Sequence, residues 1–315
     1  MRSANIIRMP EAAHTVAGRI GPIVDSNVHL WEQPRNPVFW LEDRTMLRDM
    51  IGDYDSLPDT YTLADYEDAT SPFDVRGVVW SDAGAVDPVA ACERVATQNT
   101  DGQVVGLVAL ADPTDPGFER LVSAFGATTS VTSVRVRLVP GFQPGSSTTT
   151  ADPAGDRLID GLALLAEQGL VATIETGASE LARVAELARR FPRLSVVLDH
   201  FGWPEDLSEP GLRDHLALLR RIADEPNVTT RIDAIGTIFR DWDTDTLRPW
   251  LHGVVKAFGP ERCMLGSDLP IETLHASFTD LYTAYDTIFA AFSADDRRLL
   301  FSDTTRRVYG GGTPA

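Results

Sequence analysis

Short apolar runs alternate along the chain with longer segments in which apolar residues recur every three to four positions. The short runs predict eight strands, over residues 23–29, 75–81, 103–110, 131–138, 170–176, 194–200, 227–233 and 262–268. The longer segments predict helices, over residues 88–97, 116–125, 156–168, 179–190, 211–224, 245–258, 277–292 and 294–309. Several strands are apolar throughout, which is typical of a parallel sheet covered by helices.

Regular alternation of eight strands with helices predicts an α/β fold, and at 315 residues it favours a closed (β/α)8 TIM barrel over an open sheet. No Gly-x-Gly-x-x-Gly follows a predicted strand, so nothing indicates a dinucleotide site. We expect residues 1–20 to form an N-terminal arm and residues 21–315 to form one barrel domain.

Two segments interrupt this regular pattern. Residues 32–72 are rich in Pro, Asp and aromatic residues and predict a long irregular loop after the first strand. Such a loop is either a surface excursion or a lid, and its position after the first strand favours a lid. A Gly/Ser/Thr-rich loop is expected over residues 141–155.

Composition and charge narrow the possible partners. The formal net charge of -18 argues against nucleic acid, which needs clustered Lys and Arg, but one or two buried arginines could still hold an anionic small molecule. Cys92 and Cys263 fit neither a zinc motif nor a disulfide framework. Because we find no signal peptide and no membrane-spanning apolar run, we expect a cytoplasmic protein without a membrane partner. The oligomeric state cannot be read from the sequence.

Polar side chains gather at the ends of the predicted strands. They are Asn27 and His29, Ser81 and Asp82, Arg135 and Arg137, Glu175, Asp199 and His200, Arg231 and Asp233, and Ser267 and Asp268. In a β/α barrel the carboxyl ends of all strands open onto one face, so these side chains are expected to meet. Taken singly, each has a structural alternative: a strand-end Asp can be a turn residue, a His can be hydrogen-bonded in the core, and an Arg can belong to a buried ion pair. Together they predict a catalytic mouth, because such a cluster is costly to bury without a function.

The remaining histidines carry less weight. His14, His215, His252 and His275 lie on the arm, on predicted helices or in a loop, and we discount them as site residues.

Three of these strand ends carry short sequence motifs. Residues 25–31 read Asp-Ser-Asn-Val-His-Leu-Trp, residues 199–204 read Asp-His-Phe-Gly-Trp-Pro, and residues 266–270 read Gly-Ser-Asp-Leu-Pro. With the closing segment 303–309, they resemble the amidohydrolase-related family of the amidohydrolase superfamily. The resemblance extends from about residue 23 to residue 310 and implies a β/α barrel. It is closest to the family's metal-independent lactonases, which act on dicarboxylate or sugar-acid lactones.

The chain departs from the family at positions that affect metal binding. Asn27 replaces the first histidine of the opening motif, Glu175 stands where metal-binding relatives have a histidine or modified lysine, and the seventh strand reads Arg-Ile-Asp-Ala from Arg231. Asn is a poor zinc ligand, so we favour a site without metal or other cofactor. If a divalent metal such as zinc or manganese is bound, the expected ligands are His29, His200, Asp268 and Glu175.

The resemblance therefore implies a hydrolase that opens a lactone or similar cyclic ester of a small, carboxylated substrate. Asp268 would activate water, and His29 and His200, helped by Asn27, would hydrogen-bond the carbonyl oxygen. Glu175 would set the protonation of a histidine or act as a second acid/base. The expected substrate-binding residues are Arg137, Arg231, Arg135, Ser81 and Trp31.

Three alternatives stay open at this point. The first is a metal-dependent hydrolase or decarboxylase, in which an ion activates water or acts as an electron sink. The second is an isomerase, dehydratase or cyclase on the same scaffold, because a fold does not fix a reaction. The third is an inactive barrel that only binds a small acid.

Overall fold

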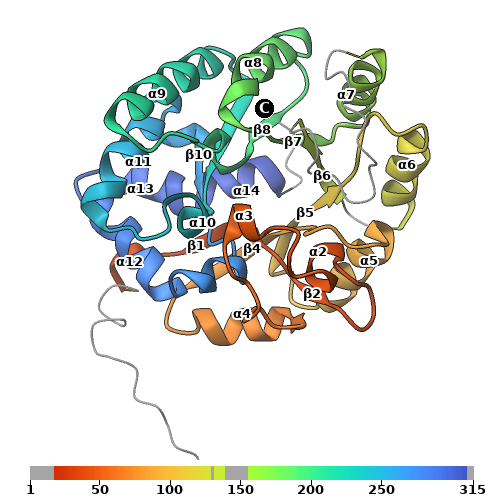
Figure 1. The fold of residues 1–315 in the computed structure, drawn as a ribbon, viewed down its shortest axis with the longest axis horizontal. Helices are drawn as coiled ribbons and strands as arrows, with labels where there is room; N and C mark the ends of the chain where they lie inside the picture. Colours follow the sequence, from red (N-terminus) through yellow and green to blue (C-terminus); the bar gives the residue numbers. More distant parts are fainter. Residues whose placement is uncertain (1–17, 129–130, 139–154, 311–315) are drawn as a thin grey trace, which may run out of the picture.

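The computed structural model describes residues 18–128, 131–138 and 155–310. Its main sheet contains eight parallel strands in the order β1-β4-β5-β6-β7-β8-β9-β10. They are β1 (Ile23–Val28), β4 (Val75–Ser81), β5 (Val104–Leu110), β6 (Val131–Arg137), β7 (Val171–Glu175), β8 (Val196–Leu198), β9 (Val228–Ile232) and β10 (Cys263–Leu265). The chain beyond β10 returns to β1, where Asp268 N donates to Asn27 O at 2.9 Å and His29 N to Leu269 O at 2.7 Å. The predicted (β/α)8 barrel is thus confirmed, as the ring of strands in Figure 1 shows.

Helices surround the strands on the outside (Figure 1). They are α5 (Pro88–Gln98), α6 (Phe118–Thr128), α7 (Asp156–Gln168), α8 (Leu181–Arg190), α9 (Glu209–Ala223), α11 (Thr244–Phe258) and α12 (Phe278–Ile288). Asp87 caps α5 through its side chain and Pro88 begins it, as the sequence predicted. The predicted last helix is divided into α13 (Ala294–Arg298), a π-helical turn (Leu299–Asp303) and α14 (Thr304–Tyr309). A short helix between β9 and α11, α10 (Ile235–Phe239), was not predicted.

The barrel interior is filled by side chains of alternate strand residues. One buried cluster combines residues of five strands with a tyrosine of α14: Val79, Val108, Val171, Val197, Met264 and Tyr309. Gly106 on β5 has no side chain because a Cβ there would lie 2.7 Å from Tyr309 Cβ. The interior is therefore a packed core, and any ligand must bind at the open end of the barrel.

The segment after β1 is more regular than predicted. Its β2 (Trp31–Glu32) pairs antiparallel with β3 (Thr60–Tyr61), and it contains α2 (Phe39–Glu42), α3 (Arg48–Ile51) and α4 (Leu63–Thr70). The prediction of an irregular loop was wrong here, because helices as short as the four residues of α2 and of α3 leave little periodicity in a sequence. Figure 1 shows α3 in front of the middle of the strand ring, where a lid would lie.

Two predicted segments fall largely outside the described residues, namely the N-terminal arm up to residue 17 and the loop over residues 141–154. Within the described ranges, no helix combines the length and apolar character needed to cross a bilayer.

Candidate active site

The first group of site residues joins the two strands that close the barrel. Asn27 Nδ2 donates to Asp268 Oδ1 at 2.8 Å, and His29 Nε2 lies 3.1 Å from the same oxygen. His29 Nδ1 lies 2.7 Å from the carbonyl oxygen of Ser81, which can only accept, so Nδ1 carries a proton. Nε2 of the same ring thus lies within hydrogen-bond distance of the Asp268 carboxyl group. Along the described chain, Oδ2 of Asp268 has no hydrogen-bond partner.

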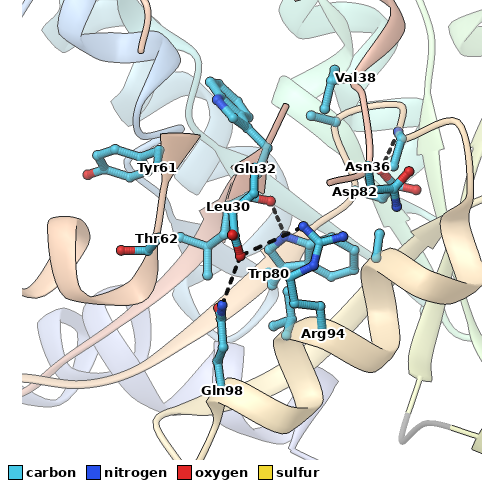
Figure 2. Close-up of a pocket in the computed structure, with 15 residues that line it drawn as sticks. Leu30, Glu32, Asn36, Val38, Tyr61, Thr62, Trp80, Asp82, Arg94 and Gln98 are labelled. Carbon is cyan, nitrogen blue, oxygen red and sulfur yellow. Dashed lines mark hydrogen bonds and ion pairs between the residues drawn. The ribbon is translucent and has the colours of Figure 1, made fainter. Parts of the chain in front are cut away.

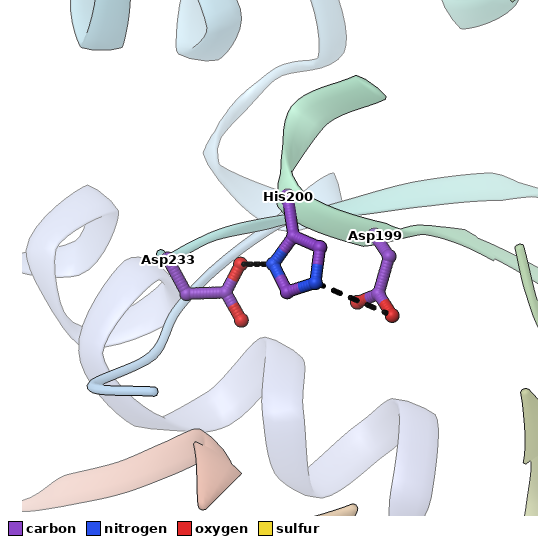
Figure 3. Close-up of side chains that lie close together, drawn as sticks. All are labelled: Asp199, His200 and Asp233. Carbon is purple, nitrogen blue, oxygen red and sulfur yellow. Dashed lines mark hydrogen bonds and ion pairs between the residues drawn. The ribbon is translucent and has the colours of Figure 1, made fainter. Parts of the chain in front are cut away.

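The second group surrounds His200, just beyond β8. Its Nδ1 lies 2.9 Å from Asp233 Oδ1, and its Nε2 lies 3.9 Å from Asp199 Oδ2, too far for a hydrogen bond (Figure 3). His200, Phe201 and Trp203 all have positive φ, at 48°, 39° and 41°. Such strain in residues other than glycine is concentrated at functional sites. The left-handed turn ends β8 at Leu198 and places His200 at the mouth.

Buried ion pairs form the third group. Asp199 accepts from Arg231 Nε at 2.5 Å and lies 3.0 Å from Arg135 Nε. Arg137 Nε donates to Glu175 Oε2 at 2.8 Å, across neighbouring strands whose Cα atoms are paired at these positions. Burial would raise the pKa of Glu175, but Arg137 and Arg135 outweigh it and lower that pKa, so Glu175 is an ionised partner of arginine.

One pocket brings six of the ten predicted catalytic and binding residues together. Its polar floor consists of His29, Arg135, Arg137, Glu175, His200 and Asp268. Its apolar roof comes from α2 and the α3 region, with Phe39, Trp40, Leu47, Met50 and Ile51. Nη2 of Arg135 is buried and has no hydrogen-bond partner in the described ranges. A floor of ionisable groups beneath an apolar cover is the usual form of a small-molecule site, and the segment after β1 does act as its cover.

Four predicted site residues lie outside this pocket. Arg231 is fully buried and donates through Nη1 to Ser26 O at 2.8 Å and to Ser81 Oγ at 3.1 Å. Ser81 is therefore occupied by protein groups, and Asn27 reaches the pocket only through Asp268. Trp31 donates to Pro58 O at 2.9 Å and packs edge-on against Trp40, 5.8 Å between ring centroids, so it supports the roof from behind.

Trp31 instead lines a neighbouring pocket, shown in Figure 2. There Gln98 Nε2 donates to Glu32 Oε1 at 3.2 Å, and Arg94 Nη1 lies 3.8 Å from the same oxygen. Glu32 thus has a hydrogen-bond partner and a nearby cation within this pocket, which shares no polar floor residue with the mouth.

Sequence reasoning missed several residues of the mouth. Trp203 lines the pocket, and its ring centroid lies 4.7 Å from that of His200. It belongs to the motif of residues 199–204 but was not predicted as a site residue. Thr237 of the unpredicted α10 also lines the pocket, and its buried Oγ1 has no partner among the described residues. A third missed residue, Asp25 of the opening motif, does not line the pocket but supports it: it is fully buried and accepts from Ser267 N at 2.8 Å and from Tyr66 Oη at 2.9 Å. Its place in the Asp-x-Asn-x-His motif was the signal available.

The donor atoms present are a poor match for a divalent metal. Among the described residues, three ligand-type side chains approach within 4.8 Å of one another at one place, formed by Asp199, His200 and Asp233. Figure 3 shows the imidazole between the two carboxylates, so that they face different ring nitrogens. Asp199 is also paired with two guanidinium groups, whose positive charge disfavours a metal ion beside it. The predicted ligand set of His29, His200, Asp268 and Glu175 does not form such a cluster in the described chain.

The charge on His200 makes stability depend on pH. Burial alone would lower the pKa of His200, but the carboxylates of Asp233 and Asp199 outweigh burial and raise it to about 9. Since the unfolded pKa is about 6.5, the stabilisation is complete below that pH and is lost as pH rises through 9. We expect the free energy of unfolding to fall by about 3 kcal/mol across this range. Urea unfolding of the wild type and of His200→Gln at each pH checks this. The prediction would be contradicted if the free energy of unfolding changed equally with pH in the two proteins.

Comparison with known proteins agrees with the geometry. The sequence profile of the amidohydrolase family matches residues 24–311. The protein y4mH of Sinorhizobium fredii is 26% identical over 293 residues, which cover 91% of this chain and 98% of y4mH. An L-fucono-1,5-lactonase of Burkholderia ambifaria is 32% identical over 133 residues, which cover 42% of this chain and 44% of the lactonase.

Solved structures share the fold. An amidohydrolase from Burkholderia multivorans with bound zinc aligns with a TM-score of 0.76 at 21% identity, over 92% of this chain and 99% of its own. A proposed 2-pyrone-4,6-dicarboxylic acid hydrolase from Pseudomonas putida aligns with a TM-score of 0.67 at 20% identity, over 91% of this chain and 97% of the hydrolase chain. Since the family profile extends over most of the chain, the protein belongs to the amidohydrolase family and is an enzyme of the amidohydrolase superfamily.

Proposed function

We propose that the enzyme hydrolyses a lactone, or a similar cyclic ester, of a small carboxylated molecule without a bound metal. One observation carries this proposal. Asp268, His200 and Arg135 line one pocket and have complementary roles. Among the described residues, Oδ2 of Asp268 and Nη2 of Arg135 have no hydrogen-bond partner, and no group accepts a hydrogen bond from Nε2 of His200. The names of the lactonase relative and of the pyrone hydrolase structure also denote hydrolysis of ring esters.

Asp268 is the general base in this mechanism. Asn27 and His29 both hydrogen-bond its Oδ1 and thereby orient Oδ2. As the oxygen of a water molecule attacks the lactone carbonyl carbon, Oδ2 takes one proton from that water. When the ring C–O bond breaks, the carboxyl group returns this proton to the departing ring oxygen, which leaves as a hydroxyl group. Asn27 and His29 therefore orient the base, in place of the carbonyl contact that the sequence suggested.

His200 stabilises the charge that forms on the carbonyl oxygen. Its Nδ1 is held by Asp233, so its Nε2–H can donate to the developing oxyanion. Burial would raise the pKa of Asp233, but the charge on His200 outweighs this and lowers it to about 2, which keeps the orienting carboxylate ionised. Asp233 fixes this donor in place, and a donor fixed in advance is what makes oxyanion stabilisation effective.

Arg135 and Arg137 bind the substrate carboxylate. A buried guanidinium nitrogen without a partner is costly, and a planar carboxylate would satisfy the unpartnered Nη2 of Arg135. Arg137 lines the same side of the pocket, two residues further along β6. Arg231 was predicted to bind substrate, but its bonds to Asp199, Ser26 and Ser81 instead favour a role in holding Asp199 in place.

The test is turnover of a panel of lactones, each offered as the free acid and as the matched methyl ester, in the presence of a chelator. We expect hydrolysis of at least one acid, with less than about a tenth of an equivalent of metal in the protein and one ¹⁸O from labelled water in the product. Activity that needs about one equivalent of zinc or manganese would favour the metal-dependent alternative. A product without ¹⁸O would favour an isomerase or cyclase.

A further inference from the structure

The hydroxyl group of Tyr285, on α12, contacts the ends of two strands that carry site residues. Its oxygen lies 3.1 Å from the carbonyl oxygen of Ile232 and 3.1 Å from that of Gly266. A tyrosine hydroxyl has one proton, so it is a shared donor to both carbonyls. Ile232 directly precedes Asp233, and Gly266 lies two residues before Asp268.

The two strand ends meet at this point with no spare room. Gly266 N donates to Ile232 O at 3.1 Å. A Cβ atom on Gly266 would lie only 3.1 Å from Cβ of Asp233 and 3.2 Å from Cβ of Asn27. Because real Cβ atoms rarely approach this closely, a side chain at position 266 would displace residues of the site.

The strand ladder itself gives Asp268 little support. β10 ends at Leu265, and beyond it Asp268 adopts a positive φ of 58°. From the β1 side, this segment is held by Asp25, which accepts from Ser267 N at 2.8 Å, and by Asn27 O, which accepts from Asp268 N at 2.9 Å. On the side of α12, the hydroxyl group of Tyr285 holds the segment through its contact with the carbonyl oxygen of Gly266.

We infer that Tyr285 is a positioning residue for catalysis. Its hydroxyl group fixes the ends of β9 and β10 relative to one another, and so aligns Asp233, which orients His200, with Asp268. Tyr285 does not line the pocket and acts only through these strand ends. The roles of His200 and Asp268 in this inference rest on the proposed function.

α12 offers a matched control in Tyr282. Both tyrosines are fully buried and lie about one turn apart on the same helix. The hydroxyl group of Tyr282, however, has no hydrogen-bond partner among the described residues. Replacing either tyrosine by Phe removes one oxygen atom, but only Tyr285→Phe removes a contact with the strand ends.

The experiment compares kcat, KM and melting temperature of Tyr285→Phe and Tyr282→Phe, each assayed well below its own melting temperature. We expect kcat to fall about 10- to 100-fold in Tyr285→Phe with KM changed less than about threefold, because small displacements of reacting groups are costly. Tyr282→Phe should stay within about twofold of the wild type. Equal kcat values in the two variants would overturn the inference, because a purely structural loss would lower only the melting temperature.

Hydrogen exchange separates this inference from the proposed function. We expect faster amide exchange in peptides spanning residues 232–236 and 264–270 of Tyr285→Phe, and no change there in Tyr282→Phe. If the wild type hydrolyses no lactone, the proposed function fails, while unchanged exchange in Tyr285→Phe would overturn the positioning role. If Tyr285→Phe does not fold, Gly266→Ala displaces the same junction, and wild-type kcat in that variant would overturn the inference.

Discussion

Replacing Asp268 by Asn should lower kcat for lactone hydrolysis by about 10³-fold or more and change KM less than about threefold. An amide has nearly the shape of a carboxylate, so its oxygen can still accept from Asn27 Nδ2, as Asp268 Oδ1 does at 2.8 Å in the wild type. What is lost is the ability to take a proton from water. The change therefore removes a step of the reaction and leaves substrate binding intact.

Steady-state kinetics and calorimetric titration with a slowly hydrolysed carboxylated lactone check this prediction. Asp286→Asn is a suitable control, because Asp286 is a buried carboxylate outside the pocket that pairs with Arg19 and Arg297. It should keep wild-type turnover even where it lowers stability. Near-normal kcat in Asp268→Asn would assign the base to another residue.

Replacing His200 by Gln should lower kcat about 10²- to 10³-fold, the usual cost of losing one oxyanion donor. The imidazole of this pocket residue uses Nδ1 for Asp233, at 2.9 Å, while its Nε2 has no hydrogen-bond partner among the described residues and lies 3.9 Å from Asp199 Oδ2. A neutral amide cannot keep that ion pair and the charged donor at once. Because Asp233 acts through His200, we expect Asp233→Asn to lower kcat when it is made in the wild type. Made in His200→Gln, the same change should hardly lower kcat further.

A double-mutant cycle measures this coupling directly. Kinetics of the two single variants and the double variant, with the same lactone, give the interaction free energy between the two side chains. Purely additive losses would mean that Asp233 contributes independently of His200, and that the orientation of the imidazole is set elsewhere, for example by Trp203 at 4.7 Å.

Strand positions were predictable because strands of a parallel barrel are buried on both faces and leave continuous apolar runs. The predicted ends were less accurate at the site. The strand predicted over residues 262–268 ends at Leu265, because Ser267 and Asp268 leave the ladder to bond with Asp25 and Asn27. The strand predicted over residues 194–200 ends at Leu198, where the left-handed turn with His200 begins. Local patterns do not record such departures, because they are stabilised by residues distant in the sequence.

The sequence by itself determined the family, the barrel and the strand ends from which most of the pocket's polar residues come, since strand order and side-chain alternation follow from local patterning. Only the tertiary structure decided which of them face the pocket. Arg135 and Arg231 look alike in the sequence, and both pair with Asp199, yet Arg135 lines the pocket, whereas Arg231 does not and donates to Ser26 O and Ser81 Oγ. Asn27 and Trp31 likewise support the site from behind. The reason is physical: a buried charge takes its role from the partners around it, and those partners come from other strands.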